Sequence, residues 1–280
     1  MRILVTGSKG QLGRELTRVL AVSHEVGGTD LPELDIRDAA AVARLVGEMR
    51  PEVVIHAAAL TDTRRCEEEP ELAHQVNAVG TENVALACRE VGAALAYVST
   101  NEVFDGRKGE PYLESDAPNP VNAYGQSKLA GEGQVRSLLE RYWVVRTAWL
   151  YGEGTGNFPS KILAAAERGE LSVVTDEIAT PTWARDLAAA IASLVQRPVY
   201  GVYHFTNGGE CSRYEWAREA LRLSGRGDVP VRPTTMAEYG AFPVKPPYSV
   251  LGNEAGAKIG IELRPWREAL AEFFAPPLER

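Results

Sequence analysis

Residues 1–13 of the chain read Met-Arg-Ile-Leu-Val-Thr-Gly-Ser-Lys-Gly-Gln-Leu-Gly. The apolar run Ile3–Thr6 predicts a buried strand that passes directly into a glycine-rich turn, and the apolar spacing of Leu12–Leu20 predicts a helix. A strand, a glycine turn and a helix in this order are typical of dinucleotide-binding folds, because the turn lets the backbone approach a pyrophosphate and the helix N-terminus offers free N–H groups. The alternative is a glycine turn without a ligand. The predicted cofactor contacts in this stretch are Gly7, Gly10, Gln11, Leu12 and Gly13.

The first half of the chain alternates short apolar strands with amphipathic helices. The expected strands span residues 3–6, 24–28, 53–56, 95–99 and 142–147, and the expected helices span 12–20, 39–49, 72–91 and 123–139. Continuous apolar strands separated by helices imply βαβ units and a parallel sheet that is covered on both faces. Right-handed crossovers then predict a doubly wound α/β fold of the Rossmann type.

The second half of the chain has a looser pattern, with helices expected at 158–168, 183–195 and 213–223 and a strand at 202–206. Glycine and proline become frequent between Arg226 and Pro247. We interpret residues 1–148 as a dinucleotide-binding domain and 149–280 as mainly a smaller substrate-binding lobe. Residues 182–206 are expected to return to the first domain, so the lobe is discontinuous in sequence.

Composition narrows the class of protein. The 280 residues carry a formal net charge of −8 at pH 7, which disfavours binding to nucleic acid or to an anionic membrane. The three cysteines and four histidines show no metal-ligand spacing, so free thiols in a reducing compartment and no metal site are expected. No apolar run is long enough to span a bilayer, and the N-terminus has no secretory pattern. We therefore expect a cytoplasmic protein.

Asp30 follows the second expected strand, where a carboxylate can accept hydrogen bonds from the ribose of an adenosine. An acidic residue there favours a free 2′-hydroxyl group over a 2′-phosphate. We therefore predict NAD(P)H as the cofactor, with NADH slightly favoured over NADPH. The alternative is a solvated aspartate in a turn.

Tyr124-Gly-Gln-Ser-Lys128 places a phenol and an ammonium four residues apart, on one face of an expected helix. The cation is expected to lower the pKa of the phenol and so to improve it as a proton donor. Ser99 and Thr100 end the preceding strand, at the sheet edge where ligands bind. Thr100, Tyr124 and Lys128 are therefore the candidate catalytic residues, although a YxxxK pattern on a solvent-exposed helix face is common.

These segments resemble the extended short-chain dehydrogenases/reductases and, within them, the dTDP-4-dehydrorhamnose reductase family. The likeness covers nearly the whole chain. It rests on the glycine turn, Asn77, Ser99-Thr100, Val103-Phe104-Asp105-Gly106, the Tyr124–Lys128 pair, Arg146-Thr147-Ala148-Trp149, Tyr151-Gly152, Pro181-Thr182 and Leu263-Arg264-Pro265-Trp266.

The resemblance implies reduction of the 4-keto group of dTDP-6-deoxy-L-lyxo-4-hexulose to dTDP-L-rhamnose. Tyr124 would protonate the forming alkoxide, Lys128 would position the cofactor, and Thr100 would orient the carbonyl. The remaining implied contacts are Ala57, Ala58, Ala59 and Asn77 at the cofactor, and Thr100, Asn101, Glu102 and Trp149 at the sugar.

The sequence departs from the family pattern at three places. The family usually reads Ser-Thr-Asp-Tyr-Val-Phe-Asp-Gly after the fourth strand, whereas this chain has Asn101 and Glu102 in place of the acid and the aromatic residue. An inward-pointing carboxylate at Glu102 would repel a nucleotide diphosphate. Glu177 stands where glutamine is typical, and the segment from Lys245 to Ser249 lacks the arginine–proline pair often seen before the serine.

Two alternatives therefore stay open: a reductase or epimerase of another nucleotide sugar, and a dinucleotide-binding regulatory subunit that resembles the β subunit of methionine adenosyltransferase. The intact Thr100, Tyr124 and Lys128 set favours an enzyme. The resemblance also implies a possible homodimer. Some family members bind magnesium through glutamates at that interface, and Glu15 fits one such position, but an ordinary surface glutamate is the better interpretation.

Overall fold

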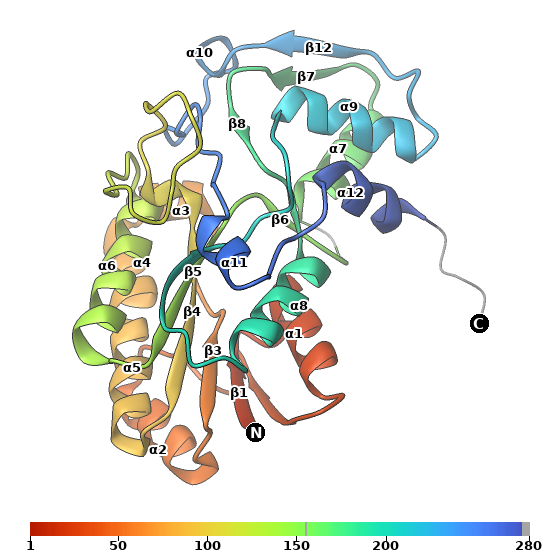
Figure 1. Ribbon diagram of the computed structural model, residues 1–280. Coiled ribbons are helices and arrows are strands. Elements are labelled where there is room, and N and C mark those ends of the chain that lie inside the picture. The colour runs from red at the N-terminus through yellow and green to blue at the C-terminus, as the bar shows by residue number, and fades with distance from the viewer. Residues whose placement is uncertain (155, 276–280) are drawn as a thin grey trace.

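The computed structural model describes residues 1–154 and 156–275. Its centre is a six-stranded parallel sheet with the strand order β10-β5-β4-β3-β1-β2 (Figure 1). The strands are β1 (Arg2–Thr6), β2 (Glu25–Thr29), β3 (Val53–His56), β4 (Ala94–Thr100), β5 (Tyr142–Thr147) and β10 (Gly201–His204). The chain leaves β1 for β2 on one side and then crosses to β3 on the other, which creates a crevice at the carboxyl ends of the strands.

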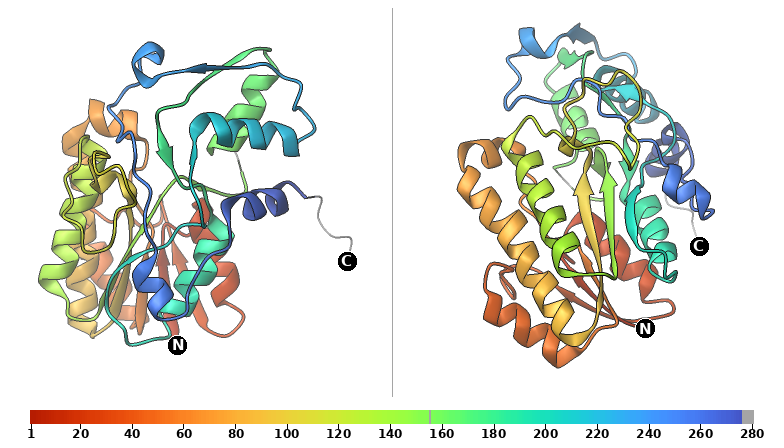
Figure 2. Two further views of the ribbon diagram at one scale, coloured as in Figure 1. Left: turned by 45° about the horizontal axis from the view of Figure 1, so that its top comes forward. Right: turned by 60° about the vertical axis from the view of Figure 1, so that its left-hand side comes forward.

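Helices cover both faces of this sheet (Figure 2). On one face lie α1 (Gln11–Leu20) and α8 (Ala184–Leu194), and on the other lie α2 (Ala39–Met49), α5 (Gly80–Val91) and α6 (Ala123–Leu138). Alternate residues of β1 serve the two faces: Ile3 and Val5 pack with α1 and α8, whereas Leu4 packs with the other layer. The predicted doubly wound α/β fold is confirmed.

A smaller lobe lies beyond the carboxyl ends of the strands (Figure 1). The aromatic residues Tyr151, Trp183, Trp216 and Trp266 form one of its two hydrophobic cores. Its main elements are α7 (Phe158–Ala166), β7 (Leu171–Val174), β8 (Ile178–Ala179), β11 (Cys211–Ser212), α9 (Arg213–Leu223), β12 (Val231–Thr234), α10 (Met236–Tyr239) and α12 (Trp266–Phe274).

The chain passes repeatedly between the sheet and the lobe. The short strands β6 (Leu150–Tyr151) and β9 (Thr182–Trp183) pair at the crossing, after which α8 packs on α1 and β10 pairs with β5. Helix α11 (Glu254–Lys258) also contacts β10. We therefore keep the division at residue 148, with 182–206 returning to the sheet, as a proposal that these contacts support.

The helix expected over 72–91 is interrupted. It consists of α4 (Pro70–His74), a π-helical turn η1 (Gln75–Val79) and α5, and the short helix α3 (Thr63–Glu68) precedes it. A single-turn 3₁₀ helix, η2 (Asn101–Val103), follows β4. Both irregular turns lie beside the carboxyl edge of the sheet, where π-turns and 3₁₀ turns often serve a functional site.

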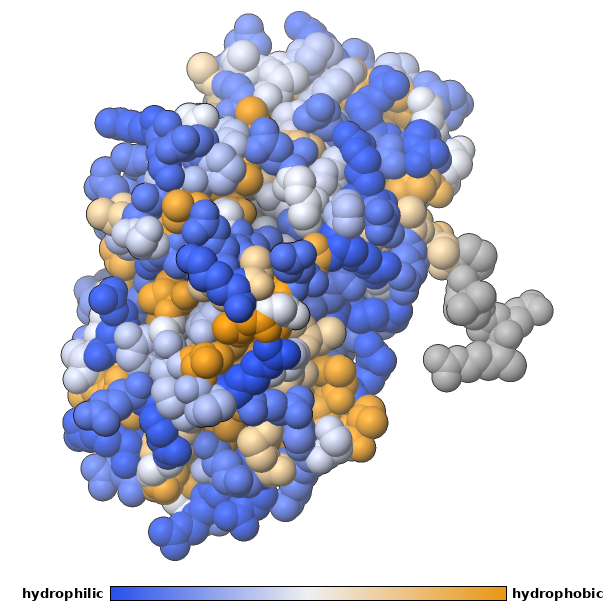
Figure 3. Space-filling view, viewed as in Figure 1, coloured by the Kyte–Doolittle hydropathy of each residue, from blue (hydrophilic) through white to orange (hydrophobic). Residues whose placement is uncertain are grey.

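The surface is mainly hydrophilic in the view of Figure 3, and the hydrophobic residues visible there form small separate groups. Among the described residues, no helix has both the length and the apolar character needed to cross a membrane.

Candidate active site

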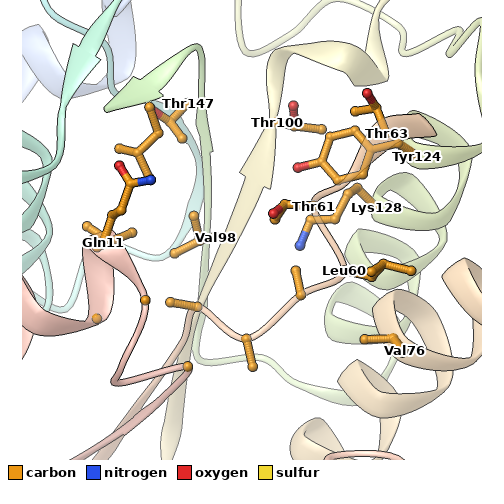
Figure 4. A pocket seen from close by; sticks show the side chains of 18 of the residues that line it. Gln11, Leu60, Thr61, Thr63, Val76, Val98, Thr100, Tyr124, Lys128 and Thr147 are labelled. Carbon is orange, nitrogen blue, oxygen red and sulfur yellow. The ribbon is translucent and has the colours of Figure 1, made fainter. Parts of the chain in front are cut away.

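A cavity of about 860 Å³ lies between the carboxyl edge of the sheet and the lobe. Its walls come from the glycine turn, from the ends of β2, β3, β4 and β5, from the start of α6 and from α7 and α9 of the lobe. Figure 4 shows Gln11 and Thr147 on one side of it, facing Thr100, Tyr124 and Lys128 on the other. With the exception of Asn77, every residue that the sequence analysis assigned to the site lines this cavity.

The glycine turn forms the floor of the cavity. Helix α1 begins after Gly10, and no side chain caps its N-terminus, so the N–H groups of its first turn are free to bind an anion. A Cβ atom on Gly13 would collide with the Gly7 carbonyl oxygen. The turn can therefore fold back tightly on the helix only because Gly13 has no side chain.

Two buried polar atoms beside this turn have no hydrogen-bond partner among the described residues: Gln11 Oε1 and Thr147 Oγ1. An unpaired buried polar atom costs about 1–3 kcal/mol. Both residues line the cavity, so a polar ligand can satisfy them there. Together with the free helix N-terminus, they fit a dinucleotide.

Asp30 lies at the end of β2, where the ribose of an adenosine is expected. Its carboxylate accepts hydrogen bonds from the Lys9 and Leu31 backbone N–H groups, at 2.9 and 2.8 Å. These two bonds fix the carboxylate on the cavity wall and leave acceptor capacity for a ribose hydroxyl group.

Tyr124 and Lys128 project from the first turns of α6 into the cavity (Figure 4). Asn122 caps this helix by accepting the Gly125 N–H at 2.8 Å. The Lys128 ammonium lies 4.1 Å from the ring centroid of Tyr97, a cation–π contact that offsets part of its desolvation.

Burial controls the titration of both groups. It raises the pKa of the Tyr124 phenol well above its usual value; the Glu102 carboxylate raises it further, and the Thr100 hydroxyl acts in the opposite direction. Burial also lowers the pKa of Lys128 to about 7, against the effect of Glu132. The pKa of the phenol is thus raised, contrary to the expectation from the neighbouring Lys128, because desolvation is the largest effect on it.

Glu132 lies one turn after Lys128 on α6 and is almost completely buried. Its carboxylate accepts hydrogen bonds from Arg146 Nε and Nη2, at 2.9 and 2.7 Å, and from Ser99 Oγ at 2.6 Å. These bonds join α6 to the ends of β4 and β5. They fix the register of the helix that carries Tyr124 against the strand that carries Thr100.

Asn77 lies behind the cavity wall, in the π-turn. Its side chain bonds both backbone groups of Leu60, accepting the N–H at 2.8 Å and donating to the carbonyl at 3.0 Å. It also donates to Ser127 Oγ at 3.0 Å. Leu60 itself lines the cavity. We therefore propose that Asn77 acts on the cofactor site indirectly, by holding Leu60.

Trp149 forms the lobe side of the cavity. The Trp149 ring stacks on that of Trp216, with ring centroids 5.5 Å apart. The Arg213 guanidinium lies 3.7 Å from the centroid of the Trp149 ring. The backbone of Trp149 has a φ of 43°, which is a strained conformation for a bulky residue and is typical of functional sites. Glu177, one of the departures from the family pattern, bonds Arg213 at 2.9 Å.

The Glu102 side chain, a second departure from the family pattern, is paired with the Lys245 ammonium. Its carboxylate bonds the Lys245 ammonium at 2.8 and 3.1 Å and accepts a hydrogen bond from Asn122 Nδ2 at 2.7 Å. The neighbouring Asn101 donates to Ser249 Oγ at 2.7 Å. The expected repulsion of a diphosphate by Glu102 is thus offset, because the charge of the carboxylate is paired inside the cavity.

Comparison with known proteins agrees with this geometry. A family model described as the RmlD substrate binding domain matches residues 1–278. The dTDP-4-dehydrorhamnose reductase of Streptomyces griseus is 43% identical over 282 residues, which cover 98% of this chain and 93% of that protein. The chain belongs to the dTDP-4-dehydrorhamnose reductase family.

Further relatives extend the comparison. The crystal structure of dTDP-4-dehydrorhamnose reductase from Bacillus anthracis in complex with NADP superposes with a TM-score of 0.95, at 39% identity and with 98% of each chain covered. A dTDP-4-keto-6-deoxy-D-glucose reductase from Streptomyces niveus is 38% identical, covering 98% of this chain and 96% of that protein. The predicted family and class of activity, an NAD(P)-dependent reductase, are confirmed, and the regulatory-subunit alternative is not favoured.

Most of the basic residues at this site were not predicted from the sequence. Besides Lys128, the basic side chains that line the cavity are Arg37, Arg65, Lys161, Arg213 and Lys245. Arg37, Arg65, Arg213 and Lys245 among them form ion pairs with acidic neighbours. Such residues carry no local sequence signal, because lysine and arginine on a solvated helix or loop look the same until the fold brings them together.

No group of histidine, cysteine, aspartate and glutamate side chains in residues 1–154 and 156–275 could hold a metal ion. Glu15 is nearly buried and bonds Arg18 at 2.7 Å.

Proposed function

We propose that this chain reduces the 4-keto group of dTDP-6-deoxy-L-lyxo-4-hexulose to give dTDP-L-rhamnose, with NAD(P)H as the hydride donor. One observation carries the proposal: Thr100, Tyr124 and Lys128 face a dinucleotide-binding floor across a single cavity. The names of the relatives support the substrate.

Tyr124 is the acid of the reaction. When bound, the reduced nicotinamide supplies the hydride that adds to the carbonyl carbon. The phenol is protonated at neutral pH, since its usual pKa of about 10 already lies well above 7 and burial raises it further, so it carries the proton that the carbonyl oxygen takes up as the C–O single bond forms. The Thr100 hydroxyl holds the same oxygen, and the Lys128 ammonium binds ribose hydroxyl groups of the cofactor.

The nucleotide half of the substrate would lie toward the lobe. Lys161 and Arg213 lie on the cavity wall and offer positive charge to the diphosphate, and the partly exposed ring of Trp149, backed by the buried Trp216, offers a surface for the sugar or the base. These contacts agree with a doubly negative nucleotide sugar better than with a small neutral ketone.

The decisive experiment follows the loss of nicotinamide absorbance with enzymatically generated dTDP-6-deoxy-L-lyxo-4-hexulose. We expect turnover by the native enzyme and a loss of at least about 100-fold in kcat for Tyr124→Phe, with cofactor affinity nearly unchanged. Tyr112→Phe is the control, because Tyr112 is a buried tyrosine whose hydroxyl group bonds Asp105 outside the cavity. Full activity in Tyr124→Phe would refute the assigned role.

A second keto sugar remains a candidate within the same chemistry. Asn101 and Glu102 differ from the usual family residues at the substrate loop, and one relative of similar identity is named for a different sugar. No turnover of the rhamnose precursor, with tight cofactor binding, would favour this candidate.

The homodimer and the cytoplasmic location stay predictions of the sequence analysis. Sedimentation of the purified chain would test the first, and fractionation of cells would test the second.

A further inference from the structure

Three segments of the chain meet at the Glu102 carboxylate. It lies in η2, after β4; Asn122 is the N-cap of α6, and Lys245 comes from the segment that leads from α10 back to the sheet. Both charged side chains are mostly buried, with exposed fractions of 15% for Glu102 and 16% for Lys245. Both nevertheless line the substrate cavity.

Glu102 is placed beside the reacting centre. Its backbone N–H donates to Thr100 Oγ1 at 3.1 Å, and its charge acts on the Tyr124 phenol. If Thr100 and Tyr124 hold the carbonyl oxygen of the substrate, Asn101 and Glu102 are the neighbouring polar residues on the wall. Asn101 is already bonded to Thr100 and Ser249, so the polar side chain available to the sugar is that of Glu102. The group within its reach is then a substituent on a carbon adjacent to the carbonyl.

The Glu102–Lys245 pair retains unused hydrogen-bonding capacity. The carboxylate has about four acceptor positions, of which Lys245 and Asn122 take three. The ammonium has about three N–H donors, of which two point to Glu102. One acceptor and one donor remain, and a sugar hydroxyl group can satisfy both.

Both residues stand in segments where this sequence departs from the family pattern, although they are 143 positions apart. Their contact explains the two departures together: a carboxylate at 102 requires a cation to neutralise it, and Lys245 supplies that cation. The usual aromatic contact with the sugar is replaced by a polar one.

We propose that Glu102 and Lys245 together form a specificity element that selects keto sugars bearing a hydroxyl group on the carbon next to the carbonyl. This inference rests on the proposed function, because it assumes that a keto sugar occupies the cavity. It goes further by naming the substituent that the site recognises and the residues that recognise it.

The test compares kcat/KM for two nucleotide sugars, dTDP-6-deoxy-L-lyxo-4-hexulose and its analogue lacking the hydroxyl group next to the carbonyl. We expect the native enzyme to prefer the first by about 10- to 100-fold, the value of one hydrogen bond to a charged partner. In the double variant Glu102→Leu/Lys245→Met, which removes both charges, the preference should fall to about 2-fold or less. Glu102→Gln, a milder change, should give an intermediate preference.

Lys108→Met is the control, because Lys108 forms a partly buried ion pair with Asp116 outside the cavity. It should keep the native preference. Cofactor affinity and melting temperature, measured for each variant, separate a change in specificity from a loss of fold.

An unchanged preference in folded Glu102→Gln and in the double variant would overturn this inference and leave the proposed function intact. Absence of turnover of either sugar by the native enzyme, with cofactor still bound, would overturn the proposed function and this inference with it.

Discussion

Asp30 holds a fixed negative charge at the ribose end of the cavity, tied there by two backbone N–H groups. A carboxylate in this position repels a 2′-phosphate and attracts a 2′-hydroxyl group. We therefore predict that Asp30→Asn raises kcat/KM for NADPH relative to NADH by about 10-fold. Initial rates with each cofactor measure the ratio, and Glu48→Gln, on the exposed face of α2, is the control. A ratio that stays constant would show that Asp30 does not contact the ribose.

Lys128 provides a second test at the scale of one residue. Because burial lowers its pKa to about 7, the charged fraction falls as the pH rises through 7, and most of the ligand-free protein is neutral at this position at pH 8. Hydrogen bonding to ribose hydroxyl groups favours the ammonium. We therefore expect NADH binding to take up part of a proton at pH 8 and almost none at pH 5.5.

Titration calorimetry in buffers with different ionisation enthalpies measures this proton uptake. Lys128→Met should abolish it, whereas Lys108→Met should not. Binding at pH 8 without proton uptake would mean that Lys128 does not gain its charge from the cofactor.

Single site residues could be predicted from the sequence only where the residues that act together are close to one another along the chain. Tyr124 and Lys128 share a helix face, and Gly7 to Gly13 form a continuous turn, so both groups could be proposed from the sequence, and both line the cavity. Lys245 and Arg213 were missed because their partners, Glu102 and Glu177, lie 143 and 36 positions away. Likewise, burial of the Tyr124 phenol is a property of the folded cavity and could not be weighed against the nearby lysine beforehand.

At the scale of elements, the π-turn η1 has a task that a regular helix would not perform. It directs the Asn77 side chain to both backbone groups of Leu60. Asn77→Ala would leave these part-buried groups without partners, so we predict a loss of about 2 kcal/mol in the free energy of unfolding and weaker NADH binding. Urea unfolding and fluorescence titration measure the two effects.

Asn119→Ala is the control for this variant, because Asn119 makes one exposed side-chain hydrogen bond, to Asp105. It should cost less than about 0.5 kcal/mol. Equal losses in the two variants would argue against a special role for the π-turn.

Some helices and strands could be predicted from the sequence and others could not. Strands β3 and β5 and helices α2 and α9 were predicted with their observed bounds, because each is a continuous apolar or amphipathic stretch. The two-residue strands β6, β8, β9 and β11 were not, since each is defined by pairing with a distant segment rather than by its own pattern. The π-turn escaped notice because its apolar spacing resembles that of the α-helices around it.

At the scale of the whole molecule, the chain carries a net charge of −8, yet its cavity gathers cations from the sheet domain and from the lobe. The overall charge repels a nucleotide sugar at long range, but this repulsion is screened beyond about 10 Å at 0.1 M salt. Charges inside the cavity therefore affect binding more than the net charge does, and Lys161 of the lobe is one of them.

Lys161, which α7 brings from the lobe to the cavity wall, allows a direct test of this balance. We predict that Lys161→Gln lowers kcat/KM for the nucleotide sugar by about 5- to 10-fold at low salt, because one favourable charge is removed near the diphosphate. The difference from the native enzyme should shrink as salt is raised to about 0.5 M, since screening weakens what the lysine contributed. Lys258→Gln is the control. It removes an exposed lysine paired with Glu254 on α11, so it changes the net charge by the same amount as Lys161→Gln but does not alter the cavity. If both variants lost the same activity, net charge rather than the position of Lys161 would govern substrate capture, and the lobe would have no electrostatic part in it.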